Sequence, residues 1–298
     1  MTPIVLSLPG SEAIGRSLAS ALQTDVGACE IRRFPDGESY VRIDVPVAGR
    51  PVVLVCTLVR PDEKFMPLAF LAETARELGA ERIGLICPYL PYMRQDIRFH
   101  PGEAISARLF AELLGRHVDW LVTVDPHLHR LRSLTDIFAI PTAAVRAAPV
   151  LSDWILANVP DPIVIGPDSE SEQWVASVAE KVGAPFAVLR KSRRGDRDVA
   201  IALDARIDFQ RTPVLVDDII STAGTMIEAV RRLRAAGAKP PVCLGVHAVF
   251  ADGAETALMA AGAAKVVTCN TIAHGSNAID LTSLIADAAR TLLSPTKQ

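Results

Sequence analysis

Short, continuously apolar runs alternate along this sequence with longer stretches whose apolar residues recur at helical spacing. The apolar runs predict β-strands at residues 4–8, 52–56, 83–87, 120–124, 162–166, 186–189, 214–218, 242–249 and 265–269. The helical patterns lie at residues 11–22, 66–78, 104–116, 171–182, 224–236 and 253–261. Strands that alternate with helices pair in parallel through right-handed crossovers, and strands that are apolar throughout are covered on both faces. The order therefore predicts an α/β fold of mostly parallel sheets flanked by helices.

The length of the chain and a recurring junction both favour two domains. The chain has 298 residues, whereas a single domain usually takes about 100–200. A Gly-Ala pair closes a helical pattern before a strand in each half of the chain, at Gly79 and at Gly237. Glycine at such a place relieves the strain of a left-handed helix C-cap, and its use in both halves hints at an internal duplication.

The boundary between the two domains is expected near Pro141 and Pro149. We therefore predict one domain at residues 1–145 and a second at residues 146–298. The last helical pattern, at residues 281–293, has no strand after it, and we expect it to pack back on the first domain.

Composition and charge argue against several classes of partner. The formal net charge of −3 gives no basic footprint for a nucleic acid. No run approaches the ~18 apolar residues of a membrane span, and the run at 4–8 lacks the basic leader of a signal peptide. The five cysteines are odd in number and contain no CxxC pair, which argues against a disulfide framework or a zinc site. We expect a soluble cytoplasmic protein with no nucleic-acid and no membrane partner.

The strand at 214–218 ends in the most chemically loaded segment of the chain. Two carboxylates, Asp217 and Asp218, stand at its carboxyl end, where open parallel sheets bind ligands. A small turn rich in hydroxyls then opens a helix, with Ser221, Thr222, Ala223, Gly224 and Thr225. Such a turn can bind a phosphate, and the carboxylates can bind sugar hydroxyls directly or through Mg2+. The alternative, a strand end before an N-capped helix, gives the two carboxylates no structural task.

Two further loops lie in the expected first domain. One is a Pro-Asp-Gly turn between extended segments, which brings together an aromatic ring and two carboxylates, at Phe34, Asp36 and Glu38. The other follows the strand at 83–87, where two prolines exclude a helix, and it carries Arg94, Gln95 and Asp96. Arg94 can bridge phosphates, and Gln95 can form hydrogen bonds. The alternatives are a plain surface turn and a loop with a surface salt bridge.

Three more segments carry candidate ligands. Asp125-Pro126-His127 ends a strand, where a histidine suits a metal or phosphate contact, although a structural histidine is the alternative. Asp168 follows the next strand, where a carboxylate can hold a cation or cap a helix. The basic run at residues 191–197 is either a solvated charge run or a flexible loop that closes over a polyphosphate and neutralises developing charge.

In this order, the segments resemble those of ribose-phosphate pyrophosphokinases, over roughly residues 4–280. The resemblance implies two tandem phosphoribosyltransferase-like domains of type I, each a mostly parallel sheet flanked by helices. The family's ATP-contacting positions match Phe34, Asp36, Glu38, Arg94, Gln95, Asp96 and His127. Its ribose 5-phosphate site matches Asp217, Asp218, Ser221, Thr222, Ala223, Gly224 and Thr225. Its metal positions match His127 and Asp168, and its mobile catalytic loop matches Lys191 and Arg193.

The resemblance also implies a reaction. The 1-hydroxyl of ribose 5-phosphate attacks the β-phosphorus of Mg-ATP, and AMP leaves, in a transfer that depends on positioning and charge neutralisation. It further implies ATP and ribose 5-phosphate as substrates, Mg2+ as cofactor and a homo-oligomer, dimer or higher. Two alternatives stay open. One is a non-catalytic regulatory paralogue that binds the sugar phosphate, and the other is a nucleobase phosphoribosyltransferase, which needs the segment at 214–225 but no Arg-Gln-Asp loop.

The sequence departs from the commonest bacterial pattern of that family in three places. Ser221 stands where an aspartate is usual, and Glu170 and Ser171 replace a glycine pair. The Arg-Gln-Asp loop runs into residues 97–103, in a form that resembles archaeal-type members. These differences leave the matched ATP and sugar positions in place.

Overall fold

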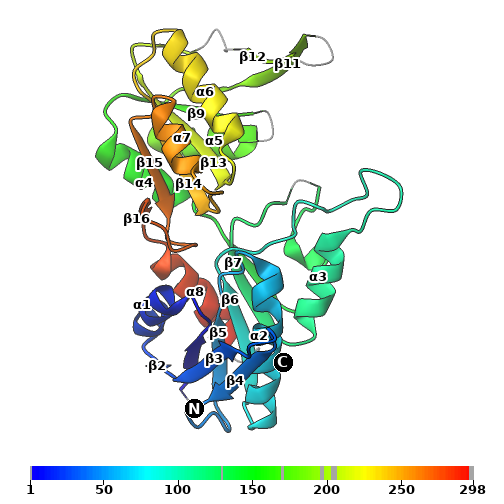
Figure 1. Cartoon of the computed structure of the whole chain (residues 1–298). Coiled ribbons are helices and arrows are strands. Elements are labelled where there is room, and N and C mark those ends of the chain that lie inside the picture. Colours follow the sequence, from blue (N-terminus) through cyan, green and yellow to red (C-terminus); the bar gives the residue numbers. More distant parts are fainter. Residues whose placement is uncertain (1, 129, 169–170, 195–197, 203–206, 295–298) are drawn as a thin grey trace. The chain divides into compact units, whose positions relative to one another are not determined.

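The computed structural model describes residues 2–128, 130–168, 171–194, 198–202 and 207–294, and these form two compact units (Figure 1). The first unit comprises Met1–Val145, Thr271–Ala273 and Leu281–Gln298. The second unit comprises Arg146–Asn270 and His274–Asp280. The chain therefore leaves the first unit after Val145, re-enters it briefly at Thr271–Ala273, and returns to it with its last helix.

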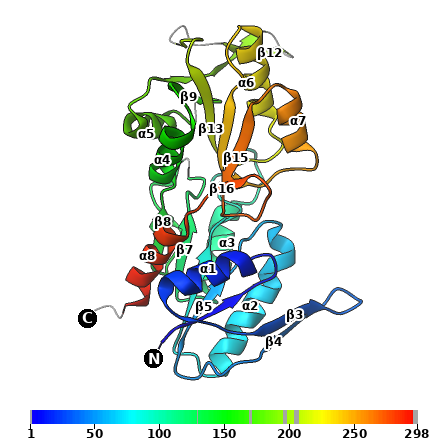
Figure 2. The same cartoon turned by 90° about the vertical axis from the view of Figure 1, so that its left-hand side faces the viewer.

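A parallel sheet forms the centre of the first unit, in the order β2-β1-β5-β6-β7-β8. Its strands are β1 (Ile4–Ser7), β2 (Asp25–Val26), β5 (Pro51–Val55), β6 (Arg82–Cys87), β7 (Trp120–Val124) and β8 (Thr142–Val145), with a 3-10 helix η1 (Leu134–Asp136) before β8. One face is covered by α2 (Pro61–Glu77) and α3 (Ser106–Gly115). The other is covered by α1 (Glu12–Leu22) and α8 (Thr282–Leu293), which pack on each other (Figure 2).

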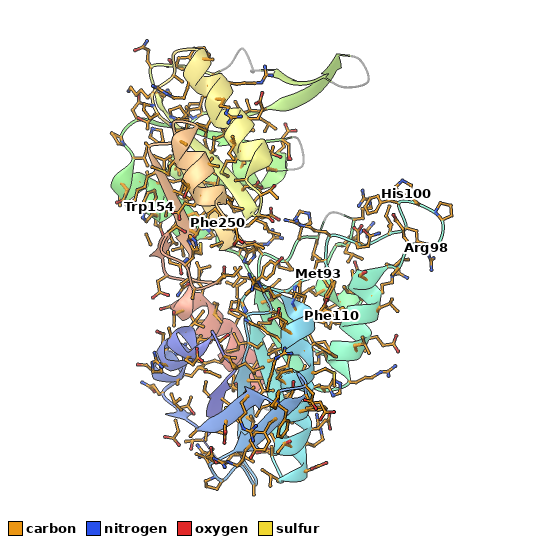
Figure 3. The ribbon with its side chains drawn as sticks, viewed as in Figure 1. Met93, Arg98, His100, Phe110, Trp154 and Phe250 are labelled. Carbon is orange, nitrogen blue, oxygen red and sulfur yellow. The ribbon has the colours of Figure 1, made fainter. Side chains whose placement is uncertain are left out.

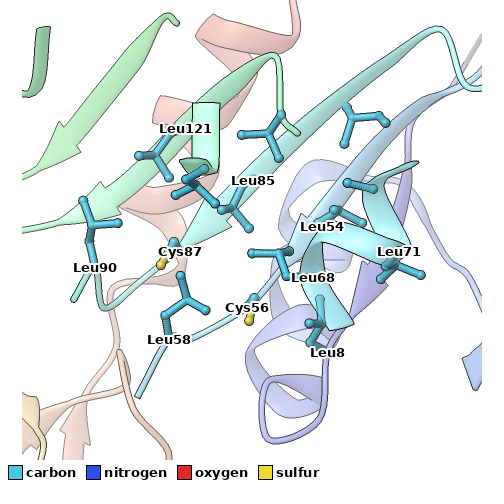
Figure 4. Close-up of a cluster of buried hydrophobic side chains, with 14 of the residues drawn as sticks. Leu8, Leu54, Cys56, Leu58, Leu68, Leu71, Leu85, Cys87, Leu90 and Leu121 are labelled. Carbon is cyan, nitrogen blue, oxygen red and sulfur yellow. The ribbon is translucent and has the colours of Figure 1, made fainter. Parts of the chain in front are cut away.

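Leucines hold the sheet of the first unit against α2. Leu54 of β5 and Leu85 of β6 are fully buried in one cluster with Leu68 and Leu71 of α2 (Figure 4). Full burial of one leucine side chain contributes about 1.5–3 kcal/mol. The cluster fixes the ends of β5 and β6, from which loops with candidate site residues leave.

A second parallel sheet forms the centre of the second unit, in the order β10-β9-β13-β14-β15-β16. Its strands are β9 (Pro162–Gly166), β10 (Phe186–Val188), β13 (Thr212–Ile220), β14 (Val242–Ala248), β15 (Lys265–Cys269) and β16 (Asn277–Ile279). The helices are α4 (Ala148–Asn158), α5 (Glu172–Val182), α6 (Gly224–Ala235) and α7 (Ala254–Ala260). α6 and α7 pack on one core cluster of this sheet, and α4 packs on α5 at its other face.

The two units repeat one topology. In each sheet the second strand along the chain lies at one edge, next to the first, and the later strands follow in order on the other side. In each unit an antiparallel hairpin follows that second strand: β3 (Cys29–Arg33) with β4 (Ser39–Ile43), and β11 (Arg190–Arg194) with β12 (Asp198–Ala202). Gly79 and Gly237 end equivalent helices with φ of 86° and 85°. The structure thus bears out the duplication that the Gly-Ala junctions indicated.

The structure also contains elements that the apolar pattern did not predict. They are β2, β3, β4, β8, β11, β12, β16 and α4. A flexible loop was expected at 191–197. This prediction is wrong for residues 191–194, because their backbone pairs with β12 as part of strand β11, and residues 195–197 lie outside the described residues. α4 begins beside Pro149, which the first helical turn tolerates because proline lacks an N–H and the first N–H groups of a helix have no partner within the helix. Among the described residues, no helix is long and apolar enough to span a bilayer.

Candidate active site

The carboxyl end of β13 carries Asp217 and Asp218. β13 lies between β9 and β14, at the point where the strand order of the sheet reverses, and ligands of open parallel sheets bind at such a point. Opposite Asp217, β14 has Gly245, where an added Cβ would lie 2.6 Å from Ile220 Cδ1. The absence of a side chain at Gly245 therefore makes room for the end of β13.

The turn after β13 leaves backbone N–H groups for a ligand. Ala223, the N-cap of α6, has a left-handed φ of 57°, which is costly for a residue with a Cβ. The carbonyl of Ser221 accepts the N–H of Ala251 at 3.1 Å, which fixes the start of the turn. The first N–H groups of a helix have no acceptor within the helix, and the helix dipole favours an anion there. The turn from Ser221 to Thr225 therefore has the form of a phosphate-binding site.

Three carboxylates lie within electrostatic range at this edge of the second sheet. Burial, together with repulsion from Asp218 and Asp168, raises the pKa of Asp217 well above its usual value. The backbone N–H of Asp218 donates to Asp217 Oδ1 at 3.0 Å and opposes this rise. A buried cluster of like charge is stabilised by hydrogen-bond donors or by a cation. Sugar hydroxyls and a divalent cation both meet that requirement.

Ser171, the N-cap of α5, is bonded back to Asp168 after β9. Ser171 Oγ donates to the carbonyl of Asp168 at 2.7 Å. The same oxygen lies 2.4 Å from the place of a Cβ at Gly166. The absence of a side chain at Gly166 therefore leaves space for the Ser171 hydroxyl that makes this bond.

The loop after β6 presents its three matched residues differently. Arg94 is exposed, Gln95 is half-buried and Asp96 is buried. Gln95 Nε2 donates to Glu103 Oε2 at 3.1 Å. Arg94 is thus open to a ligand, whereas Gln95 is held by its own loop.

Tyr92 anchors this loop to α2. It has a left-handed φ of 66°, and its hydroxyl donates to Asp62 Oδ1 in the first turn of α2. Its ring packs on Phe110 of α3 with centroids 4.8 Å apart. Burial and the hydrogen bond to Asp62 raise the pKa of Tyr92 to about 12. Its hydroxyl is therefore protonated at neutral pH and remains a donor.

The segment 97–103 is ordered around Glu103. The Glu103 carboxylate accepts the backbone N–H groups of Phe99 at 2.8 Å and His100 at 3.0 Å. Hydrogen bonds with His100, from the side chain first and then the backbone, lower the pKa of Glu103. Figure 3 shows Arg98 and His100 on the part of this segment that extends beyond the start of α3. The segment 97–103 is therefore an ordered loop in which the carboxylate of Glu103 accepts the backbone N–H groups.

Phe34, Asp36 and Glu38 occupy the exposed tip of the β3–β4 hairpin. The tip is closed by two hydrogen bonds, from Phe34 N to Glu38 O at 2.8 Å and from Gly37 N to Phe34 O at 2.9 Å. Arg33 at the end of β3 donates to the carbonyl of Glu63 at 2.8 Å. The first turn of α2 therefore contacts both this hairpin and the loop that carries Tyr92.

The Asp125-Pro126-His127 segment leaves β7 in a strained turn. Asp125 has a φ of 30° and donates its N–H to the carbonyl of Val145 at 2.9 Å. Strained backbone of this kind costs about 1–3 kcal/mol and clusters at functional sites. His127 follows half-buried in the same unit as Arg94.

The corner of the first unit that matches the β9–β13 corner is closed by its own side chains. Glu12 Oε2 accepts the N–H of Gly10 at 2.9 Å, and Ser11 Oγ accepts the N–H of Thr57 at 2.9 Å. Lys64 Nζ donates to the carbonyl of Thr57 at 2.7 Å. The two units therefore share a fold but differ at this corner. In the second unit the corner carries carboxylates and a turn suited to a phosphate, whereas in the first unit its own side chains occupy the hydrogen-bonding groups.

The carboxylates of the second unit fit a hard cation that is carried by a substrate. Among the described residues, no group of three or more His, Cys, Asp or Glu side chains is arranged to hold a metal. Mg2+ usually keeps several waters and is bound by one or two carboxylates plus substrate phosphates, so it needs no such cage. His127 belongs to the first unit and Asp168 to the second.

Lys191 and Arg193 lie in β11, where they pair with Ile201 and Val199 of β12. Their side chains lie outside the described part of the structure.

Known proteins match both halves of the chain. Residues 4–117 match the N-terminal domain of ribose phosphate pyrophosphokinase, and residues 133–282 match the phosphoribosyl transferase domain. The ribose-phosphate pyrophosphokinase of Methanopyrus kandleri is 35% identical over 292 residues, which are 97% of this chain and 99% of that protein. This chain belongs to the ribose-phosphate pyrophosphokinase family.

Other members of the ribose-phosphate pyrophosphokinase family agree in length and fold. The enzyme named so in Saccharolobus solfataricus is 33% identical over 273 residues, with 90% of this chain and 93% of that protein covered. The crystal structure of phosphoribosylpyrophosphate synthetase from Mycobacterium smegmatis matches with a TM-score of 0.84 and 28% identity, over 98% of this chain and 99% of that one. The two phosphoribosyltransferase-like domains expected from the sequence are confirmed.

Four residues of the site escaped the sequence analysis. Tyr92 and Glu103 lie in segments that it singled out, but no pattern indicated that they hold those segments in place. Asp62 and Arg130 lie 30 and 34 residues from their partners Tyr92 and Asp96. Contacts over such separations become visible only when the sheet brings its loops together.

Proposed function

We propose that this chain is a ribose-phosphate diphosphokinase, which transfers the β,γ-diphosphoryl group of Mg-ATP to the 1-hydroxyl of ribose 5-phosphate and releases AMP. One observation carries the proposal. This chain, which matches a family member over almost its full length, combines the Asp217–Asp218 corner and its phosphate turn with an exposed Arg94 on an anchored loop. A phosphate turn alone supports many reactions, whereas its combination with a nucleotide loop supports a reaction between a sugar phosphate and a nucleotide.

On the sugar side, the proposal gives each group of the corner a task. Asp217 and Asp218 accept hydrogen bonds from the ribose hydroxyls, and these bonds stabilise the ionised Asp217 against the burial and the repulsion that raise its pKa. The 5-phosphate binds in the turn from Ser221 to Thr225, at the N-terminus of α6.

On the nucleotide side, Arg94 and Gln95 bind ATP, with Phe34, Asp36 and Glu38 of the hairpin tip as further contacts. His127 binds the nucleotide phosphates and, with Asp168, belongs to the proposed Mg2+ positions. Mg2+ supplies charge neutralisation on the phosphates when it is bound. Lys191 and Arg193 stabilise the charge that develops in the transition state.

We also propose a homo-oligomer that works in the cytoplasm. Two pairs of large apolar side chains stay exposed on neighbouring helices, Met66 with Phe70 on α2 and Leu109 with Leu113 on α3. Each pair is spaced by four residues and therefore shares a helix face. The cytoplasmic location is supported by the five cysteines, which are free thiols.

The function is tested by incubating the protein with ATP, ribose 5-phosphate and Mg2+ and separating the nucleotides by chromatography. We expect AMP to form in step with phosphoribosyl pyrophosphate, and to stop forming after exhaustive chelation of the metal. ADP as the stoichiometric product, or full turnover without metal, contradicts the assignment.

The same preparation separates the alternatives. A regulatory paralogue binds ribose 5-phosphate without forming AMP, and a nucleobase phosphoribosyltransferase consumes phosphoribosyl pyrophosphate with a base. The match of residues 4–117 to the N-terminal domain of ribose phosphate pyrophosphokinase supports the diphosphokinase over the phosphoribosyltransferase.

A further inference from the structure

The carboxylate of Asp96 is occupied within the protein. Its side chain is only 2% exposed, and Arg130 Nη1 donates to its Oδ1 at 2.9 Å. The backbone N–H of Arg130 donates to its other oxygen, Oδ2, at 3.3 Å. A carboxylate that is buried and bonded through both oxygens is poorly placed to contact a nucleotide. The residue that matches an ATP contact in the family therefore has a structural partner here.

The ion pair joins two loops that carry candidate nucleotide ligands. Asp96 follows Arg94 and Gln95 directly on the loop after β6, whereas Arg130 follows His127 by three residues on the loop after β7. The two strands are neighbours in the sheet, but their ends are free to diverge once the ladder stops. A buried, charge-assisted hydrogen bond fixes the distance between them.

The outer face of Arg130 is held by a second contact. Its guanidinium lies over the ring of Phe99 at 5.2 Å, and Phe99 donates its N–H to Glu103. Glu103 in turn holds the side-chain amide of Gln95 at 3.1 Å. Arg130 thus contacts the loop after β6 at two places, the carboxylate of Asp96 and the ring of Phe99, and hydrogen bonds to Glu103 connect Phe99 with Gln95.

We propose that Arg130 is a positioning residue that orients the Arg94–Gln95 loop for ATP by clamping Asp96. This inference rests on the proposed function for the identity of the nucleotide. Loss of the arginine leaves a buried carboxylate without its charged partner, and such a group moves toward water or takes up a proton. Either change displaces Arg94 and Gln95, which precede Asp96 directly, while the ribose 5-phosphate residues belong to the other unit.

The test measures binding of Mg-ATP and of ribose 5-phosphate separately, by calorimetry on the full-length protein. We expect Arg130→Ala to weaken Mg-ATP binding by about tenfold or more, the worth of one charge-assisted hydrogen bond, with ribose 5-phosphate binding unchanged. Arg130→Lys keeps the charge and the backbone donor, so it should recover much of the affinity. Arg132→Ala removes an exposed arginine two residues away and should match wild type.

Equal ATP affinity in the Arg130→Ala and Arg132→Ala variants overturns the proposal. A folded Arg130→Ala variant whose affinities for Mg-ATP and ribose 5-phosphate fall equally also overturns it. If Arg130→Ala does not fold, the same comparison is made with Arg130→Lys. In a double-mutant cycle, Arg130→Ala should cost little more once Asp96→Asn is present, and full additivity contradicts the clamp. If ATP binding depends on Arg130 as predicted but the wild-type protein forms no AMP, the proposed function is refuted and the positioning role of Arg130 is retained.

Discussion

The backbone N–H of Asp218 donates to Asp217 Oδ1 at 3.0 Å, in a corner where burial and neighbouring carboxylates raise the pKa of Asp217. One hydrogen bond to the charged form does not offset the loss of water and the repulsion from Asp218 and Asp168. The ionised Asp217 therefore lowers the free energy of unfolding of the ligand-free protein. Binding sites often retain such unfavourable groups because the ligand supplies the missing interactions.

Asp217→Asn is expected to stabilise the ligand-free protein. Because the folded state holds its proton more tightly than the unfolded state, the free energy of unfolding falls as pH rises above 3.8, the ordinary value for Asp, toward the raised pKa. Asparagine does not titrate, so the advantage of the variant in Tm should grow over that range, to about a few degrees. Thermal melts across pH check this, with exposed Asp252→Asn as control. A Tm gap that shrinks with rising pH contradicts the assignment.

The combined change Asp217→Asn with Asp218→Asn is expected to weaken ribose 5-phosphate binding far more than ATP binding. Both carboxylates lie in the second unit beside the phosphate turn, whereas Arg94 and Gln95 lie in the first. Two lost charge-assisted hydrogen bonds correspond to roughly a hundredfold in affinity. Separate titrations with the two ligands measure both affinities. If a folded variant loses affinity for ATP and for ribose 5-phosphate equally, the two carboxylates are wrongly assigned to the sugar site.

Local patterns sufficed to predict the β13 corner. The apolar run, the carboxylate pair and the small turn are consecutive in the sequence, and the structure places them at a strand end before α6. The predicted strand ended at Asp218, whereas β13 continues to Ile220 because its pairing with β14 does. The apolar run alone did not predict that this strand would pair with β14.

Tyr92→Phe is expected to raise KM for ATP about fivefold and to leave KM for ribose 5-phosphate unchanged. The change removes one hydrogen bond, worth about 1 kcal/mol, to Asp62, while the ring keeps its packing on Phe110. The left-handed Tyr92 then lacks the bond that holds its loop to α2. Steady-state kinetics with each substrate varied in turn measure both constants.

Asp62→Asn is the matched control for Tyr92→Phe. The amide keeps an oxygen that can accept the tyrosine hydroxyl, so this variant should stay near wild type. If Tyr92→Phe also stays near wild type for ATP, Tyr92 does not position the loop.

Lys191→Ala and Arg193→Ala are each expected to lower kcat by on the order of 10²-fold, the worth of one preorganised charged contact in a transition state. KM should change far less, because an interaction made mainly in the transition state lowers kcat and kcat/KM together. Rapid-quench or steady-state assays of AMP formation measure the effect. Arg197→Ala lies beyond Gly195 and outside the Lys-x-Arg pattern, so it should retain wild-type kcat. Three variants with unchanged kcat indicate a plain solvated charge run.

Two pairings in the structure could not be predicted from the sequence. The basic run at 191–197 was expected to be a loop because a highly charged segment lacks the apolar pattern of a strand. The strand formed by Arg190–Arg194 becomes evident only through its pairing with β12. Asp96 was assigned to the nucleotide by resemblance, and nothing in the sequence indicated that Arg130 would bury it. Both cases depend on partners that the chain brings together only after folding.

The central claim is that two phosphoryl groups leave ATP together. It is tested most directly with ATP labelled in one sample at the α-phosphate and in another at the γ-phosphate, each incubated with ribose 5-phosphate and Mg2+. The account predicts that the γ-label passes to the sugar product and that the α-label appears in AMP, in equal amounts. A γ-label on the sugar with the α-label in ADP contradicts it, as does the lack of any label transfer that depends on ribose 5-phosphate.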